Sequence, residues 1–187
     1  MRAVVFNSRG CGDTMLTTPQ FYSALFIGDM EHVVEHVRSL YPNSLLFANG
    51  WSLGANILVN YLGAVGAATP LAAASAMCNP FNLTIGIGDL ERGFNKIYDL
   101  NLSSAMGKMV QRNSKVWQGA GPEFKAAVAA ASPSVRAWDD ALTRISFGAR
   151  SLSISSHCDL GAWLQRHCVE LDCDRVESGC CCSVCRV

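Results

Sequence analysis

Five consecutive residues of the chain, Gly50-Trp51-Ser52-Leu53-Gly54, form a G-x-S-x-G pattern. An apolar run, Leu45 to Ala48, ends one residue before the pattern, and a helical pattern begins at Ala55. A strand, a sharp turn and a helix in this order are typical of a nucleophile elbow, which presents a serine hydroxyl for attack on an acyl carbon. The sequence therefore predicts Ser52 as a nucleophile and the backbone N–H of Leu53, at the helix N-terminus, as an oxyanion donor.

The residues around this serine, Gly50, Trp51 and Gly54, have a mechanical role in this interpretation. A serine on so sharp a turn adopts strained dihedral angles, and the two glycines lack the Cβ atoms that would hold the strand and the helix apart. The alternative is a glycine-rich turn in which Ser52 only caps the following helix.

Short apolar runs alternate with helical patterns over the first 88 residues. This alternation is typical of βαβ units with a mainly parallel sheet, so we predict an α/β fold. The expected strands are Ala3–Phe6, Ser44–Ala48, which we expect to be covered on both faces, and Leu71–Cys78. The expected helices are Asp29–Leu40 and Ala55–Leu62, with Gly63 as the cap of the second.

The remainder of the chain changes character twice. Helical patterns without clear strands cover Leu90–Tyr98, Leu102–Val116, Glu123–Ala131 and Val135–Ile145. After Gly148 no period is sustained. We therefore predict a partial core with the elbow over residues 1–80, a helical lid or cap insertion over 81–148, and an irregular, Cys-rich tail over 149–187.

Composition excludes several classes of function. Fifteen basic and fifteen acidic residues give a formal net charge of zero, which disfavours nucleic acid as a partner. The stretch from Ser39 to Gly88 carries no charge, but proline and asparagine interrupt it too often for a transmembrane segment. No basic and then apolar leader follows Met1, so we expect an intracellular protein.

Several segments resemble one family of enzymes. They are Val4-Val5-Phe6-Asn7-Ser8-Arg9-Gly10-Cys11-Gly12, Gly50-Trp51-Ser52-Leu53-Gly54-Ala55-Asn56, Cys78-Asn79-Pro80-Phe81, Gly93-Phe94-Asn95 and Leu142-Thr143-Arg144. Together they resemble the α/β-hydrolases of AB hydrolase family four, the embryogenesis-associated group, over most of Arg2 to Gly148. The resemblance implies a serine esterase or lipase that needs no cofactor and acts on carboxylic esters such as acylglycerols or phospholipids. It carries over Ser52 as the nucleophile and Leu53 as one oxyanion donor.

Other parts of that family's machinery have no counterpart in this sequence. The second oxyanion loop, the third strand of the sheet, and the Asp-Pro and Gly-His segments of the triad are not found, so no triad Asp or His is identified. The tail offers His157, Asp159, His167, Asp172 and Asp174, in a stretch without likeness to the family. We therefore expect a chain truncated at both ends and inactive by itself. The alternative is a non-catalytic isoform that binds lipid or a partner, and peripheral contact with a membrane stays compatible with both.

Two patterns suggest metal ions, but we predict no metal site. His32-Val33-Val34-Glu35-His36 fits an inverted zinc-protease pattern, yet a solvated helix face explains it equally well. Cys180-Cys181-Cys182 with Cys185 suits a zinc knuckle or S-acylation. Because composition and resemblance change together after Gly148, we favour a tail read from another frame, a retained intron or an alternative exon.

Overall fold

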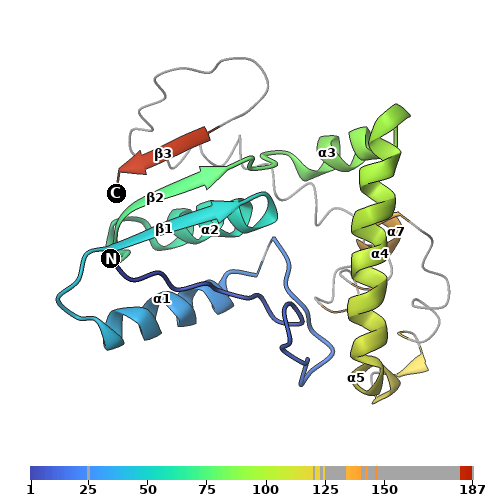
Figure 1. The fold of residues 1–187 in the computed structure, drawn as a ribbon, viewed down its shortest axis with the longest axis horizontal. Helices are drawn as coiled ribbons and strands as arrows, with labels where there is room; N and C mark the ends of the chain where they lie inside the picture. The colour runs from blue at the N-terminus through green and yellow to red at the C-terminus, as the bar shows by residue number, and fades with distance from the viewer. Residues whose placement is uncertain are drawn as a thin grey trace. The chain divides into compact units, whose positions relative to one another are not determined.

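The computed structural model describes residues 1–24, 26–119, 121–122, 124, 134–139, 142, 146 and 182–186 (Figure 1). The chain divides into two compact units. The sheet unit consists of Ser23–Asn82 and Cys158–Val187, and the helical unit consists of Met1–Tyr22 and Leu83–His157. Each unit contains its own cluster of buried apolar side chains.

The sheet unit contains the predicted parallel pair of strands. Strands β1 (Leu46–Trp51) and β2 (Leu71–Met77) run side by side, and Trp51 lies opposite Met77 (Figure 1). Helix α2 (Leu53–Val65) and a short 3-10 turn, η1 (Gly66–Ala68), connect them. Because parallel strands require such a crossover, this βαβ unit confirms the α/β fold class.

Two helices contribute to the core of the sheet unit. Helix α1 (Gly28–Leu40) buries Val34, whereas His32, Glu35 and His36 are exposed on its solvated side. Helix α2 is apolar around most of its circumference and is correspondingly well buried. The apolar cluster that joins these helices to the strands consists of Val34, Leu58, Tyr61, Leu71 and Ala74.

Two predictions about α2 and β1 are wrong. Helix α2 does not end at Gly63 but continues to Val65, and Gly66, with φ of 56°, is its C-cap. Strand β1 is not covered on both faces, because Phe47 and Trp51 are 68% and 60% exposed. Inner and outer residues alternate along β1, so helices cover only one face of this strand.

The predicted strand Ala3–Phe6 does not form, and Val4 and Val5 are exposed. A strand is stabilised by pairing with a neighbour, and no strand of the described part of the chain pairs with these residues. The tail, in contrast, is not wholly irregular. Strand β3 (Cys182–Arg186) pairs antiparallel with the free edge of β2, and Val184 lies opposite Ser75. A segment next to an open strand edge has a ready partner for its backbone N–H and C=O groups.

In its described part, the helical unit consists of one long helix and several short ones around a core rich in aromatic residues. Its elements are α3 (Leu83–Leu90), η2 (Gly93–Asn95), α4 (Lys96–Arg112), α5 (Ser114–Gly119) and α7 (Val135–Trp138). The helices predicted over 90–98 and 102–116 therefore have the wrong boundaries. The helical backbone is interrupted at Gly93, where φ is 51°, and a single helix, α4, then runs to Arg112. The buried core consists of Leu16, Phe21, Val110, Trp117, Phe124, Trp138 and Leu142.

The N-terminal segment is fixed to this unit by polar contacts with the end of α4. The guanidinium of Arg112 donates to the carbonyl oxygens of Gly10 and Gly12. The buried side chain of Asn113 accepts the backbone N–H of Leu16 at 2.7 Å. The first 22 residues therefore pack with the helices that follow residue 82.

Candidate active site

Ser52 lies at the turn between β1 and α2, the position that a nucleophile elbow requires. Its φ of 51° and ψ of −122° place it in a region of backbone conformation that favours glycine and that L side chains rarely adopt. The turn is held by hydrogen bonds on both sides. The N–H of Ser52 donates to the carbonyl of Met77 at 2.9 Å, and the carbonyl of Ser52 accepts the N–H groups of Ala55 and Asn56.

The two glycines of the pattern differ in what they contribute. A Cβ atom on Gly50 would lie 2.7 Å from the Cα atom of Ala55 and 2.7 Å from the carbonyl oxygen of Gly54. Both contacts are with backbone, so no side-chain movement relieves them. A Cβ atom on Gly54 meets nothing within 4 Å. Only Gly50 is therefore required for the close passage of strand and helix, and the prediction that both glycines serve this purpose is wrong for Gly54.

The Ser52 side chain is exposed and does not cap α2. A capping serine has an extended backbone and accepts a hydrogen bond from the first turn of the helix. Ser52 has neither property, so the geometry contradicts the alternative of a simple capping residue. Ser52 is therefore accessible to solvent.

The first backbone amide of α2 belongs to Leu53. Within the described residues no acceptor takes this N–H, whereas the next turn of the helix bonds back to Ser52. An unpaired amide at a helix N-terminus, next to an exposed hydroxyl, is placed to stabilise negative charge on an acyl oxygen.

The end of β2 lies beside the end of β1 and contains features that the sequence analysis did not assign to the site. Cys78 has φ of 52°, so it and Ser52 are the two non-glycine residues with positive φ in the described part of the chain. Asn79 is buried, and both its side-chain oxygen and its nitrogen are unpaired among the described residues. A buried side-chain amide without hydrogen-bond partners lowers the free energy of unfolding by about 1 to 3 kcal/mol. Asn79 is therefore an unusual residue for a buried position.

Two asparagines on α2, the buried Asn56 and the partly buried Asn60, form hydrogen bonds that hold this loop. The Asn56 amide, which is fully buried, donates to the carbonyl of Pro80 at 3.0 Å. Asn60 donates to Asn56 at 2.9 Å. In the sequence these residues are only two polar interruptions of an apolar helix. Their role becomes visible once α2 is placed against the loop that follows β2.

Among the residues that the structure describes, none is placed as a catalytic base for Ser52. Within the described residues the Ser52 hydroxyl has no hydrogen-bonded histidine or carboxylate. The candidates in the tail, His157, Asp159, His167, Asp172 and Asp174, lie outside the described residues. His32, Glu35 and His36 lie on the exposed face of α1, and the Nδ1 atom of His32 lies 2.6 Å from the carbonyl oxygen of Gly28.

Neither a metal cluster nor a membrane-spanning helix is found in the part of the chain that the structure describes. No three His, Cys, Asp or Glu residues there come close enough to hold a metal ion. The side chains of Cys182 and Cys185 are not among those described. No described helix combines the length and the apolar character needed to cross a bilayer.

The fold and the turn at Ser52 together define an α/β protein with a nucleophile-elbow geometry. Over 152 residues the chain is 46% identical to the embryogenesis-associated protein EMB8 of Picea glauca, a match that covers 80% of this chain and 33% of that protein. It is 34% identical over 152 residues to phospholipase ABHD3 of Mus musculus, covering 81% and 36%. It is 36% identical over 105 residues to a monoacylglycerol lipase of Saccharomyces cerevisiae, covering 56% and 21%.

These matches confirm the resemblance seen in the sequence. The chain is an α/β-hydrolase homologue of the group that contains EMB8 and phospholipase ABHD3, and its sheet unit is part of that fold. It spans about one third of the length of these two relatives. No protein-family model and no solved structure matches the chain.

Proposed function

We propose that this chain carries the nucleophile of a serine carboxylic ester hydrolase, with Ser52 forming an acyl-enzyme. The observation that carries the proposal is the strained backbone of an exposed serine between β1 and α2. The relatives are named as a phospholipase and a monoacylglycerol lipase, which supports lipid esters as the substrate class.

In the proposed reaction the Ser52 Oγ attacks the carbonyl carbon of the ester, and the bond from that carbon to the alcohol oxygen breaks. The hydroxyl proton passes through a base to the departing alcohol, and water later hydrolyses the acyl-serine. The Leu53 amide stabilises the oxyanion in both steps. Trp51 is 60% exposed beside the serine and is suited to contact the substrate.

The same geometry supports slow turnover by the 187-residue chain alone. A general base must come within about 3 Å of the hydroxyl, and the described residues supply none. We therefore infer that acylation by reactive esters is measurable but that repeated turnover is slow. The lack of a base among the described residues also favours a second candidate function, that of a non-catalytic isoform that keeps the elbow and binds lipid or a partner.

A fluorophosphonate probe separates these two functions. We expect the probe to label the folded wild-type chain and Ser44→Ala, a control with an exposed serine exchanged in the same unit. Labelling is lost in Ser52→Ala and in the heat-denatured protein. Folded wild-type protein that takes up no probe would refute an activated Ser52 and support the non-catalytic function.

A further inference from the structure

Helix α4 is oriented with its polar residues inward and apolar residues outward in its first half. Asp99 and Ser103 are almost fully buried, at 6% and 3% exposure. Ile97, Tyr98, Leu100 and Leu102 each remain about half exposed, and Phe94, just before the helix, is 74% exposed. A helix that packs in a globular unit normally shows the opposite distribution.

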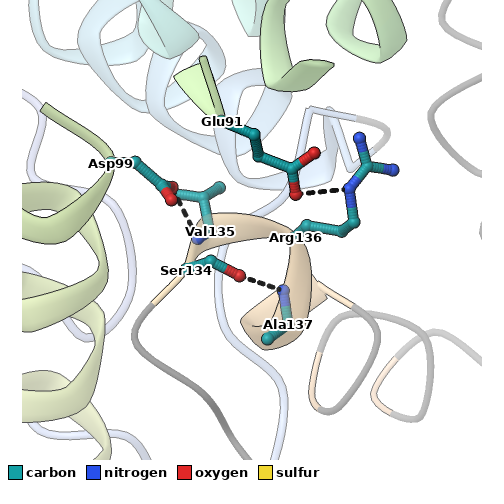
Figure 2. A network of polar contacts seen from close by, with 6 residues as sticks. All are labelled: Glu91, Asp99, Ser134, Val135, Arg136 and Ala137. Carbon is teal, nitrogen blue, oxygen red and sulfur yellow. Dashed lines mark hydrogen bonds and ion pairs between the residues drawn. The ribbon is translucent and has the colours of Figure 1, made fainter. Parts of the chain in front are cut away.

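Hydrogen bonds to α7 fix this orientation. The Asp99 carboxylate accepts the backbone N–H of Val135 at 2.8 Å, as Figure 2 shows. The Ser103 hydroxyl accepts the indole N–H of Trp138 at 3.0 Å. Turning the apolar residues inward would break both bonds and leave buried polar groups without partners.

Two further contacts hold α7 in place. Ser134 accepts the N–H of Ala137, and the Arg136 guanidinium pairs with Glu91 at 2.7 Å (Figure 2). The side chain of Glu91 is partly exposed, and the hydrogen bond from Arg136 lowers the pKa of its carboxyl group, so the pair is charged at neutral pH. The exposed apolar residues of α4 are therefore a stable feature of the helical unit.

We call Phe94, Ile97, Tyr98, Leu100 and Leu102 the α4 apolar surface. Tyr98 and Leu102 are four residues apart on α4, so they lie on one side of the helix, and Phe94 precedes the helix in η2. The rings of Phe94 and Tyr98 contact edge to face, with centroids 6.4 Å apart. Adjacent apolar side chains of this kind, exposed together, mark an interaction surface.

The exposed charged side chains of α4 itself have one sign, whereas the segment before it contains the acidic residues Asp89 and Glu91, the latter paired with Arg136. Every exposed charged side chain of α4 is basic, namely Lys96, Lys108 and Arg112, because the helix's acidic residue, Asp99, is buried. A helix with large apolar side chains and basic residues on its exposed side has the composition of a segment that lies in the interface of an anionic bilayer. A two-fold contact between copies of this chain is disfavoured, because it would bring the lysines of both copies together.

We propose that the α4 apolar surface docks on a phospholipid bilayer that contains anionic headgroups, with the helix lying along the bilayer surface. Apolar side chains enter the boundary between headgroups and acyl chains, while Lys96 and Lys108 contact lipid phosphates. This docking does not require catalysis by Ser52. It would, however, deliver the chain to the lipid esters that the proposed function names.

Sedimentation of the full 187-residue chain with vesicles tests the proposal. The vesicles are made of phosphatidylcholine alone or with 30 mol% phosphatidylglycerol. We expect binding to the anionic vesicles, weaker binding to the neutral ones, and a loss of more than about tenfold in the partition coefficient for the triple variant Phe94→Ser, Tyr98→Ser, Leu102→Ser. The exposed positions of these residues make loss of folding a minor concern, and circular dichroism checks it.

Two other variants make the test specific. The double variant Leu45→Ser, Phe47→Ser removes equally exposed apolar residues from the sheet unit and should keep full binding. Lys96→Glu with Lys108→Glu should abolish the preference for anionic vesicles and leaves the apolar residues intact.

Wild-type protein that stays in solution, or a triple variant that binds like wild type, would overturn the proposal. So would concentration-dependent self-association that the triple variant alone abolishes, because a second copy would then be the occupant. Ser52→Ala should bind vesicles as wild type does. Failure of the proposed ester chemistry is thereby distinguished from failure of docking.

Discussion

Helices α2 and α4 are held in their units by opposite means. Helix α2 is apolar and buried, and the position of its first turn is set by backbone contact with β1 at Gly50. Helix α4 presents buried polar groups to α7 and leaves apolar side chains exposed. In the sheet unit, the apolar packing of α2 and its close backbone contact at Gly50 hold Ser52 exposed in a strained backbone conformation. A few directional polar pairs support an exposed apolar surface.

The largest effect is expected from replacing Gly50. Gly50→Ala should lower the free energy of unfolding by about 3 kcal/mol, because the added Cβ atom meets backbone of α2 at 2.7 Å. Urea denaturation measures the change, and fluorophosphonate labelling of Ser52 should be lost with it. Gly54→Ala is the matched control, since it enters open space and should stabilise the helix by about 0.5 to 1 kcal/mol. Equal effects of the two substitutions would contradict the distinction drawn between these glycines.

A smaller effect is expected in the helical unit. Asp99→Ala should cost about 1 to 2 kcal/mol, because it leaves the N–H of Val135 without its acceptor. Hydrogen exchange should become faster at residues 135–138, while α2 keeps its protection. Asn101→Ala, at an exposed position of the same helix, serves as the control and should change neither quantity. If hydrogen exchange at residues 135–138 is the same in both variants, the hydrogen bond from Val135 to Asp99 does not hold α7 in place.

The smallest effect concerns a thiol in the helical unit. Burial raises the pKa of Cys11, although a hydrogen bond from Tyr22 and the charge of Arg112 oppose this in part. Burial also raises the pKa of Tyr22 to about 12, so its hydroxyl stays protonated and donates to the thiol. At pH 8 the thiolate fraction of Cys11 is therefore lower in the folded chain than in the unfolded one. Iodoacetamide should alkylate Cys11 more slowly in the native chain than in the chain unfolded in urea. The rise of the alkylation rate with pH should also occur at higher pH in the native chain. Peptide mapping by mass spectrometry separates Cys11 from the other cysteines, and identical pH profiles would refute this account.

The sequence predicts the βαβ unit and the turn at Ser52 well, because both depend on short-range signals. The apolar run before Gly50, the glycine itself and the apolar helix after Leu53 are adjacent along the chain. Pairing partners are different, since they are not encoded locally. Ala3–Phe6 has the composition of a strand but no strand to pair with among the described residues, and Cys182–Arg186 forms a strand because the edge of β2 is open.

The orientation of α4 also cannot be predicted from the periodicity of its sequence. Such a prediction assumes that apolar residues face inward, and here Asp99 and Ser103 face inward because their partners, Val135 and Trp138, lie about 35 residues further along the chain. The same holds for Asn56, whose acceptor on Pro80 is 24 residues away. Long-range polar pairs of this kind become visible only in three dimensions.

Intact-mass spectrometry after reaction with a short p-nitrophenyl ester tests the central claim, that Ser52 is presented for attack on acyl carbon. We expect the mass to increase by one acyl group, which fragmentation locates on Ser52 and which is missing from Ser52→Ala. The acyl-serine should be long-lived, because no described residue acts as a base for its hydrolysis. Acylation of other residues only, or no acylation of a folded chain, would contradict the account.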